Sequence, residues 1–176
     1  DAGQVLDLAI DTSGGRRSVW AATLGGVLRW DVATATYVKY LASDGLGDNS
    51  VACVAVDGAT GDRWFGHYDR GVSRLSADGR WAHYTSADGL PSDSVGAVAV
   101  DAGTGDKWFG TGGAGASRLS PDGRWTTFTE ADGLASDFVE DIAVDRTTGD
   151  IWFATGGGVS CLCRARATVF LPSAAR

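Results

Sequence analysis

The chain has 176 residues, of which 44% are hydrophobic and 26 are glycine, so it is long enough to bury a core and rich in tight turns. Its formal net charge is −7. An acidic surface repels the phosphates of nucleic acids and anionic membranes, and no hydrophobic run is long enough to cross a bilayer. We therefore expect no nucleic acid partner and no membrane insertion.

An internal repeat organises the whole chain. Trp20, Trp64, Trp108 and Trp152 follow one another at even intervals of 44 residues. A fixed period of this size is typical of repeat architectures in which each unit buries its hydrophobic face against the next. The period predicts a single repeat domain over 1–176, with units at about 5–50, 51–94, 95–138 and 139–176.

Each unit contains four short strand signals in a fixed order. In the third unit they cover residues 95–101, 106–111, 115–120 and 124–129. Turn residues separate them, and Pro121-Asp122-Gly123 is a strong signal for a tight hairpin turn. No segment shows the period of a helix. Four antiparallel strands in about 44 residues match one blade of a β-propeller.

Nine-residue linkers such as 86–94 join the units. Such a linker reaches about 30 Å, and strands one and four of a blade lie about 14 Å apart. The linker can therefore run from the outer strand of one blade to the inner strand of the next. The predicted fold class is an all-β propeller of four four-stranded antiparallel blades. The sequence leaves three forms open: a closed four-bladed ring, half of an eight-bladed ring completed by a second copy, or part of a longer propeller.

Recurrent aromatic and acidic residues have structural explanations. The Trp-Phe pairs are predicted to pack between neighbouring blades. Asp57, Asp101 and Asp145 end the first strand of the second, third and fourth units and are predicted to hold the following turn through side-chain to backbone hydrogen bonds. The chain has three cysteines, and this odd number predicts free thiols rather than a disulfide framework at Cys53, Cys161 and Cys163.

Several motifs recur in register and are clearest around the third unit: Gly89-Leu90-Pro91-Ser92, Val95, Asp101, Gly105, Trp108-Phe109-Gly110-Thr111 and Ser117-Arg118-Leu119. Over essentially the whole chain they resemble the two-component regulator propeller repeat. The resemblance implies a sensory propeller, like those that form the extracytoplasmic part of hybrid sensor kinases and in some cases detect oligosaccharides. It also implies a periplasmic or extracellular location, although the sequence shows no signal peptide.

The chain departs from that family in two respects. Family propellers usually have seven blades, whereas this chain carries four units. The sequence also shows no transmembrane, kinase or receiver segment. A weaker resemblance is to the streptogramin lyase propellers. Their chemistry needs a histidine and acidic metal ligands, for which this chain offers no convincing set. We therefore predict no enzyme activity, no catalytic residues, no metal and no cofactor, with a metal-dependent lyase as the alternative.

A ligand site is predicted on the face that carries the loops between the second and third strands. Only the second unit has bulky polar residues there, namely His67, Tyr68, Asp69 and Arg70. Three linker residues at equivalent places, Asn49, Asp93 and Asp137, would form a polar ring near the central mouth, or would serve as turn caps. The predicted partner is a small molecule or oligosaccharide. The alternatives are a protein partner, for an interaction scaffold, and a homodimer that completes a ring.

Overall fold

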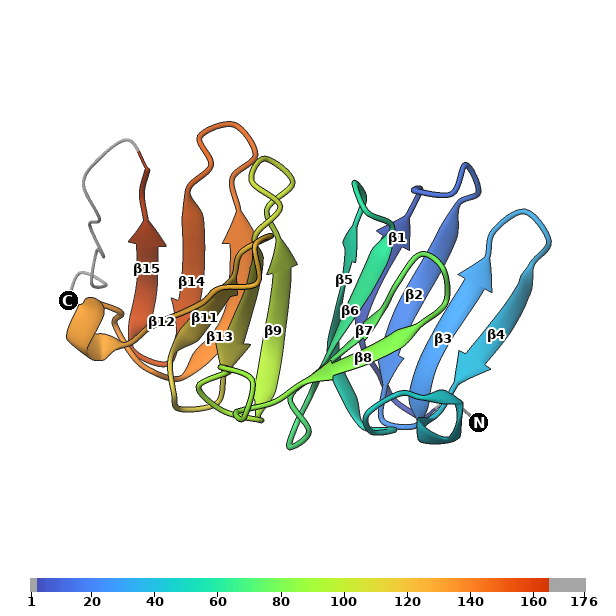
Figure 1. Ribbon diagram of the computed structural model, residues 1–176, viewed down its shortest axis with the longest axis horizontal. Coiled ribbons are helices and arrows are strands. Elements are labelled where there is room, and N and C mark those ends of the chain that lie inside the picture. Colours follow the sequence, from blue (N-terminus) through green and yellow to red (C-terminus); the bar gives the residue numbers. More distant parts are fainter. Residues whose placement is uncertain (1–2, 165–176) are drawn as a thin grey trace.

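The computed structural model describes residues 3–164. It contains four antiparallel sheets, in each of which every strand pairs with its neighbour in the sequence (Figure 1). The first three sheets have four strands, and the fourth has three within the described residues. The prediction of an all-β protein made of antiparallel blades is confirmed. The last of the four strands expected in the unit at 139–176 lies outside the described residues.

The strands have the following bounds. The first blade contains β1 (Val5–Asp11), β2 (Ser18–Thr23), β3 (Gly26–Asp31) and β4 (Thr36–Tyr40). The second contains β5 (Val51–Asp57), β6 (Asp62–His67), β7 (Val72–Leu75) and β8 (Trp81–Tyr84). The third contains β9 (Val95–Val100), β10 (Lys107–Thr111), β11 (Ala116–Leu119) and β12 (Trp125–Phe128). The fourth contains β13 (Val139–Val144), β14 (Ile151–Thr155) and β15 (Gly158–Leu162). Two short 3-10 turns, η1 (Ala42–Asp44) and η2 (Glu130–Asp132), lie in linkers.

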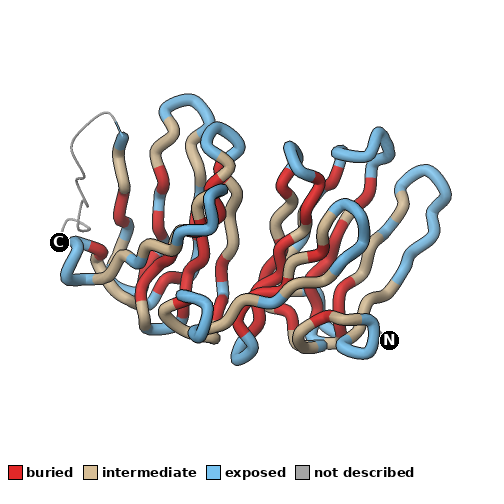
Figure 2. The backbone as a smooth tube through the Cα atoms, in the orientation of Figure 1, coloured by how far each residue is buried: buried red, intermediate tan, exposed pale blue. Residues whose placement is uncertain are grey.

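Aromatic pairs fill the three blade junctions in the same way. Because successive side chains of a strand point to opposite faces, the tryptophan of each Trp-Phe pair faces the next blade and the phenylalanine faces the preceding one. The ring centroids of Trp20 and Phe65 are 5.8 Å apart, and the equivalent pairs in the next two junctions are 5.8 and 5.7 Å apart. Figure 2 shows the buried residues along the strands where blades face one another. The predicted packing is confirmed at these three junctions, whereas Trp152 of the fourth blade is 38% exposed.

The aspartates at the ends of the first strands have two roles. Their predicted turn bonds are present: Asp57 Oδ1 accepts the N–H of Ala59 at 2.9 Å, and Asp101 and Asp145 do the same in their own turns. The sequence did not predict the second role, which is a cross-blade ion pair. Asp11 binds Arg63 of the second blade at 2.5 Å, and Asp57 binds Lys107 of the third at 3.0 Å. These pairs lock neighbouring blades together at the turn ends of the strands.

The blades form an open arc, with the two ends of the described chain at opposite sides (Figure 1). No described residue covers either outer face: Leu8 and Ile10 of β1 are 60% and 56% exposed, and Trp152 of β14 is 38% exposed. The closed four-bladed ring that we considered is therefore wrong for this structure. Three similar junctions set the angle between successive blades, and that angle leaves the arc open after the fourth.

The cysteines also differ from the prediction. Cys161 and Cys163 form a disulfide, with their Cα atoms 5.4 Å apart. That distance suits a disulfide and is shorter than the ~6.6 Å between alternate residues of a regular strand, because the chain leaves β15 between the two cysteines. Cys53 is free and buried, and burial raises the pKa of its thiol. Among the described residues no helix is long and apolar enough to span a membrane.

Candidate functional site

The predicted loop site is only partly assembled. Tyr68, Asp69 and Arg70 are exposed in the loop between β6 and β7. The N–H of Gly71 in this loop donates to the backbone carbonyl of Asp93 at 2.8 Å, so Asp93 lies beside the loop. Asn49 and Asp137 hold the equivalent places next to Gly26 and Gly115 of the first and third blades. The structure thus brings Asp93 to the predicted loop and leaves the other two at neighbouring blades.

Each of these linker residues has one side-chain oxygen committed to the backbone. Asn49 Oδ1 accepts the N–H of Ala42 at 2.8 Å. In the same way, Asp93 Oδ1 accepts the N–H of Ser86 at 2.6 Å, and Asp137 Oδ1 accepts the N–H of Glu130 at 2.7 Å. These bonds close the linkers as turn caps. Contact of the second carboxylate oxygens of Asp93 and Asp137 with a ligand stays a prediction.

His67 is not a loop residue, because it ends β6 and is fully buried. Its Nδ1 lies 3.2 Å from the Ser50 carbonyl oxygen, and its Nε2 lies 2.7 Å from Ser73 Oγ. A carbonyl can only accept, so Nδ1 carries the proton and Nε2 accepts the Ser73 hydroxyl. Ser73 Oγ is also 3.2 Å from His83 Nδ1. In the sequence the two histidines belong to a loop and to an outer strand. The pairing of β6 with β7 and of β7 with β8 brings both of them to Ser73.

A linker covers this histidine–serine cluster. Gly47 donates its N–H to Ser73 Oγ at 2.9 Å, and a Cβ added at Gly47 would lie 2.8 Å from that oxygen. A serine beside a histidine can act as a nucleophile with its base. Here the linker covers the Ser73 hydroxyl, so a substrate cannot reach it while the linker stays in place. In the third blade Pro91 stands at the position of Gly47 and lacks an N–H, and Ser117 Oγ has no hydrogen-bond partner among the described residues.

The cluster should make stability depend on pH. Burial lowers the pKa of His67 from its ordinary value of 6.5. The unfolded chain therefore binds this proton more readily, and stability that is present above pH 6.5 is lost as the pH falls below it. We expect the free energy of unfolding of the wild-type chain to fall between pH 7 and 5 by up to about 1.4 kcal/mol per pH unit.

The matched variant is His67→Thr, since threonine occupies this position in the other three blades and donates there to a glycine carbonyl at 2.7 Å. Urea unfolding followed by circular dichroism should give it a flatter pH dependence, while His83 is retained in both proteins. Equal slopes for the two proteins would show that His67 does not carry the effect.

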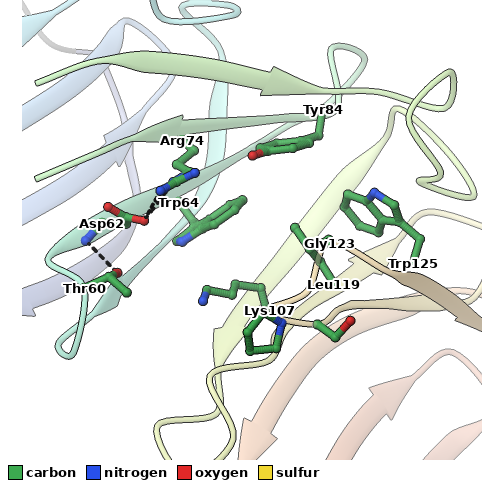
Figure 3. Close-up of a pocket in the computed structure, with 11 residues that line it drawn as sticks. Thr60, Asp62, Trp64, Arg74, Tyr84, Lys107, Leu119, Gly123 and Trp125 are labelled. Carbon is green, nitrogen blue, oxygen red and sulfur yellow. Dashed lines mark hydrogen bonds and ion pairs between the residues drawn. The ribbon is translucent and has the colours of Figure 1, made fainter.

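A cleft of about 370 Å³ opens between the second and third blades. It lies at the ends of the strands opposite the Tyr68–Arg70 loop, since Thr60 and Ser120 contribute from the β5–β6 and β11–β12 turns. Figure 3 shows Trp64, Arg74 and Tyr84 of the second blade facing residues of the third across it. Those on the third blade include Lys107, Leu119 and Trp125. Sequence reasoning missed this site because every aromatic lining it belongs to the repeat and was assigned to the core.

Charged groups in the cleft are paired and stacked. The Arg74 guanidinium binds Asp62 at 2.6 Å and lies over the Trp64 ring at 5.6 Å from its centroid. Lys107 Nζ lies 5.9 Å from the same centroid, bonds the Gly105 carbonyl at 2.7 Å and pairs with Asp57. Two cations thus share one indole ring.

The Trp64 indole N–H is buried and has no hydrogen-bond partner in the part of the chain that the structure describes. In the first junction the matching donor, Trp20 Nε1, reaches Asp11 at 3.2 Å. Trp108 Nε1 of the third junction is likewise buried and without a hydrogen-bond partner among the described residues, so the first junction differs from the other two.

The residue at the position of Lys107, which lines the cleft, differs from junction to junction. Arg63 stands at the position of Lys107 in the first junction, where its Nε and a terminal nitrogen both bind Asp11, at 2.9 and 2.5 Å. Its guanidinium lies over Trp20 at 5.2 Å. The larger group occupies space that the slimmer lysine leaves open. At the third junction Ile151 holds the position, and Arg164 binds Asp101 instead.

Comparison with known proteins supports the fold. No protein-family model matches the chain, and no curated protein matches it. Among solved structures it is similar to the extracellular domain of the putative hybrid two component system BT3049 from B. thetaiotaomicron, with a TM-score of 0.74 and 24% identity over 88% of this chain and 21% of that one.

Two further structures show the same arrangement. The extracellular domain of the putative one component system BT4673 from B. thetaiotaomicron gives a TM-score of 0.75 at 16% identity, covering 96% of this chain and 22% of that one. A nidogen/laminin complex gives 0.70 at 14% identity, covering 94% and 62%. The chain spans about a fifth of the length of the two extracellular domains. At these identities the likeness establishes the blade fold.

Proposed function

We propose that this chain is a non-catalytic ligand-binding module with a sensing role, and that its ligand is a short oligosaccharide held in the cleft between the second and third blades. The observation that carries the proposal is the cleft itself. Its volume of about 370 Å³ is within the range of small-molecule sites, and it combines aromatic rings with a few convergent polar groups.

The lining suits a sugar better than a purely apolar ligand. Tyr84 and Trp125 are half-buried, with ring centroids 6.0 Å apart, and offer apolar surface to the carbon face of a sugar ring. Arg74 and Asp62 supply a donor and an acceptor close by, so that ring hydroxyls can bind both members of an existing ion pair.

The sensing role is supported by the similar solved structures, two of which are extracellular domains of putative regulatory systems. The disulfide between Cys161 and Cys163 supports a periplasmic or extracellular location, because disulfides persist in oxidising compartments. The covered state of Ser73 supports binding rather than hydrolysis, since the hydroxyl next to His67 is shielded by Gly47.

One substitution closes the cleft without removing its charge. Lys107→Arg copies the first junction, in which arginine at this position pairs with the aspartate of the preceding blade and fills the space over the tryptophan. We expect saturable binding by a hit from an oligosaccharide panel to weaken at least tenfold in this variant, with the free energy of unfolding unchanged within about 1 kcal/mol. Isothermal titration calorimetry and urea unfolding give the two quantities.

The loop predicted from the sequence provides the competing location. Arg70→Ala tests it with the same hit, because Arg70 is exposed and far along the strands from the cleft. Loss of binding in Arg70→Ala with full binding in Lys107→Arg would move the ligand to the loop face with Tyr68 and Asp93. Full binding in both variants would exclude both locations.

A further inference from the structure

The open side of the first blade carries a continuous apolar row. Ile10, Val19, Trp30 and Tyr37 are direct cross-strand partners on β1 to β4 and therefore share one face. Trp30 and Tyr37 stack with their centroids 6.2 Å apart, and they are 42% and 62% exposed. We call this surface, together with Leu8, the first-blade face.

The open side of the fourth blade carries the matching half of a blade junction. Trp152 stands at the repeat position of Trp20, Trp64 and Trp108, which are buried in the three junctions. It is 38% exposed and lies beside Val159, which is 50% exposed, and exposed Ala143 and Ala154. We call this surface the last-blade face.

We propose that the first-blade face binds the last-blade face of a second copy of this chain. In an internal junction the tryptophan of one blade meets a phenylalanine on β-strand two and a leucine on β-strand three of the next, such as Phe65 and Leu75. The first blade has Ala21 and Trp30 at these positions. The large and small side chains are exchanged while the apolar volume is kept, and such exchanges are the ones that packed interfaces tolerate.

Charge complementarity points to the same occupant. Val19 replaces the cation that Arg63 supplies in the first junction, so the first blade cannot repeat that ion pair from the same position. Arg17 is exposed and lies two residues before Val19, directly ahead of β2. Its backbone carbonyl accepts the N–H of Val32, which continues the β2–β3 ladder and keeps Arg17 on the same face as Val19. Arg17 therefore offers a cation on this face two residues closer to the β1–β2 turn than the position of Val19.

The internal junctions show what Arg17 would meet. Gly61 is its repeat equivalent, and a Cβ on Gly61 would lie 3.4 Å from Ser13 Oγ, which itself binds Asp11 at 2.6 Å. Asp145 is the repeat equivalent of Asp11 in the fourth blade and is partly exposed. Arg17 of a second copy would thus arrive beside Asp145.

Because each copy presents both faces, two copies can make the same contact twice around a two-fold axis, which closes the assembly. The expected particle has twice the mass of the 18.2 kDa chain. This proposal does not depend on the oligosaccharide site, since the cleft between the second and third blades is complete within one copy.

Light scattering after size exclusion and sedimentation equilibrium, over a range of concentrations, test the proposal on the full chain. We expect a dimer for the wild type. Arg17→Glu and Trp152→Glu should each weaken association by tenfold or more, and Arg17→Glu with Asp145→Lys should restore it. Arg124→Glu, at an exposed turn away from both faces, is the control and should leave the dimer intact. Circular dichroism checks that each variant is folded.

Three results would overturn the proposal. A wild-type chain that stays monomeric at every concentration would leave the two faces for another protein. Unchanged association in folded Arg17→Glu and Trp152→Glu would place the contact elsewhere. A mass that grows beyond the dimer with concentration would mean that the faces join copies into open chains without closing.

Discussion

Replacing Trp108 with alanine is expected to lower the free energy of unfolding by about 3–5 kcal/mol. Trp108 is 1% exposed and packs against Phe128 of its own blade and Phe153 of the next, with centroids 5.5 and 5.7 Å away. Its loss removes a large buried surface and leaves a cavity between two blades that a fixed backbone cannot fill. Urea unfolding followed by tryptophan fluorescence and circular dichroism measures the effect.

Trp152→Ala is the matched control, because it removes the same residue at the same repeat position where no fifth blade is described. At concentrations low enough to keep the chain monomeric, it should cost less than about 1 kcal/mol. Similar losses in the two variants would contradict the idea that the junctions, rather than the individual sheets, hold the tryptophans in place.

Replacing Asp11 with alanine is expected to cost about 3–5 kcal/mol, since it breaks a buried pair and leaves one charge without its partner. The side chains of Asp11 and Arg63 are 2% and 13% exposed, and Asp11 also accepts the Trp20 indole N–H. Burial alone would raise the pKa of Asp11, but hydrogen bonds from Ser13 and Arg63 outweigh it and lower that pKa to about 2.

The sign of the pH effect follows from that shift. The lowered pKa contributes stability that is present above pH 3.8 and is lost as the pH falls from 3.8 towards 2, by about 2 kcal/mol in all. Acid unfolding of Asp11→Ala should lack this component. Asp145→Ala, which removes a turn-holding aspartate with no described partner blade, serves as the control and should keep it. Parallel acid unfolding curves for wild type and Asp11→Ala would show that the pair does not stabilise the first junction.

Much of the fold could be predicted because it depends on local and periodic signals. The even spacing from Trp20 to Trp152 gives the number of units, and the alternation of side chains along a strand directs the tryptophan and the phenylalanine of a pair to opposite faces of the blade. The turn role of Asp57 and its equivalents followed from the short reach of an aspartate side chain, which bonds the backbone two residues on. Signals of this kind need no knowledge of distant contacts.

The candidate site could not be predicted in the same way. His67 looked like a loop residue, but the register of β6 buries it against Ser73, and a linker glycine covers the pair. The disulfide was missed because only the exit of the chain from β15 brings the two cysteine Cα atoms to 5.4 Å. The cleft is lined by residues of two different blades, among them Arg74 and Lys107, so it appears only when the two blades are placed side by side.

By itself, the sequence determined the strands, the blades and the aromatic contents of their junctions, since these follow from periods of 2 and 44 residues that every unit repeats. Only the tertiary structure decided that four blades form an open arc, that Asp11 and Asp57 reach across to cations of the next blade, and that the second junction holds a cleft. The reason is physical: the angle between blades and the space between them are set by how whole side chains from different repeats fit together, and no single repeat contains that information.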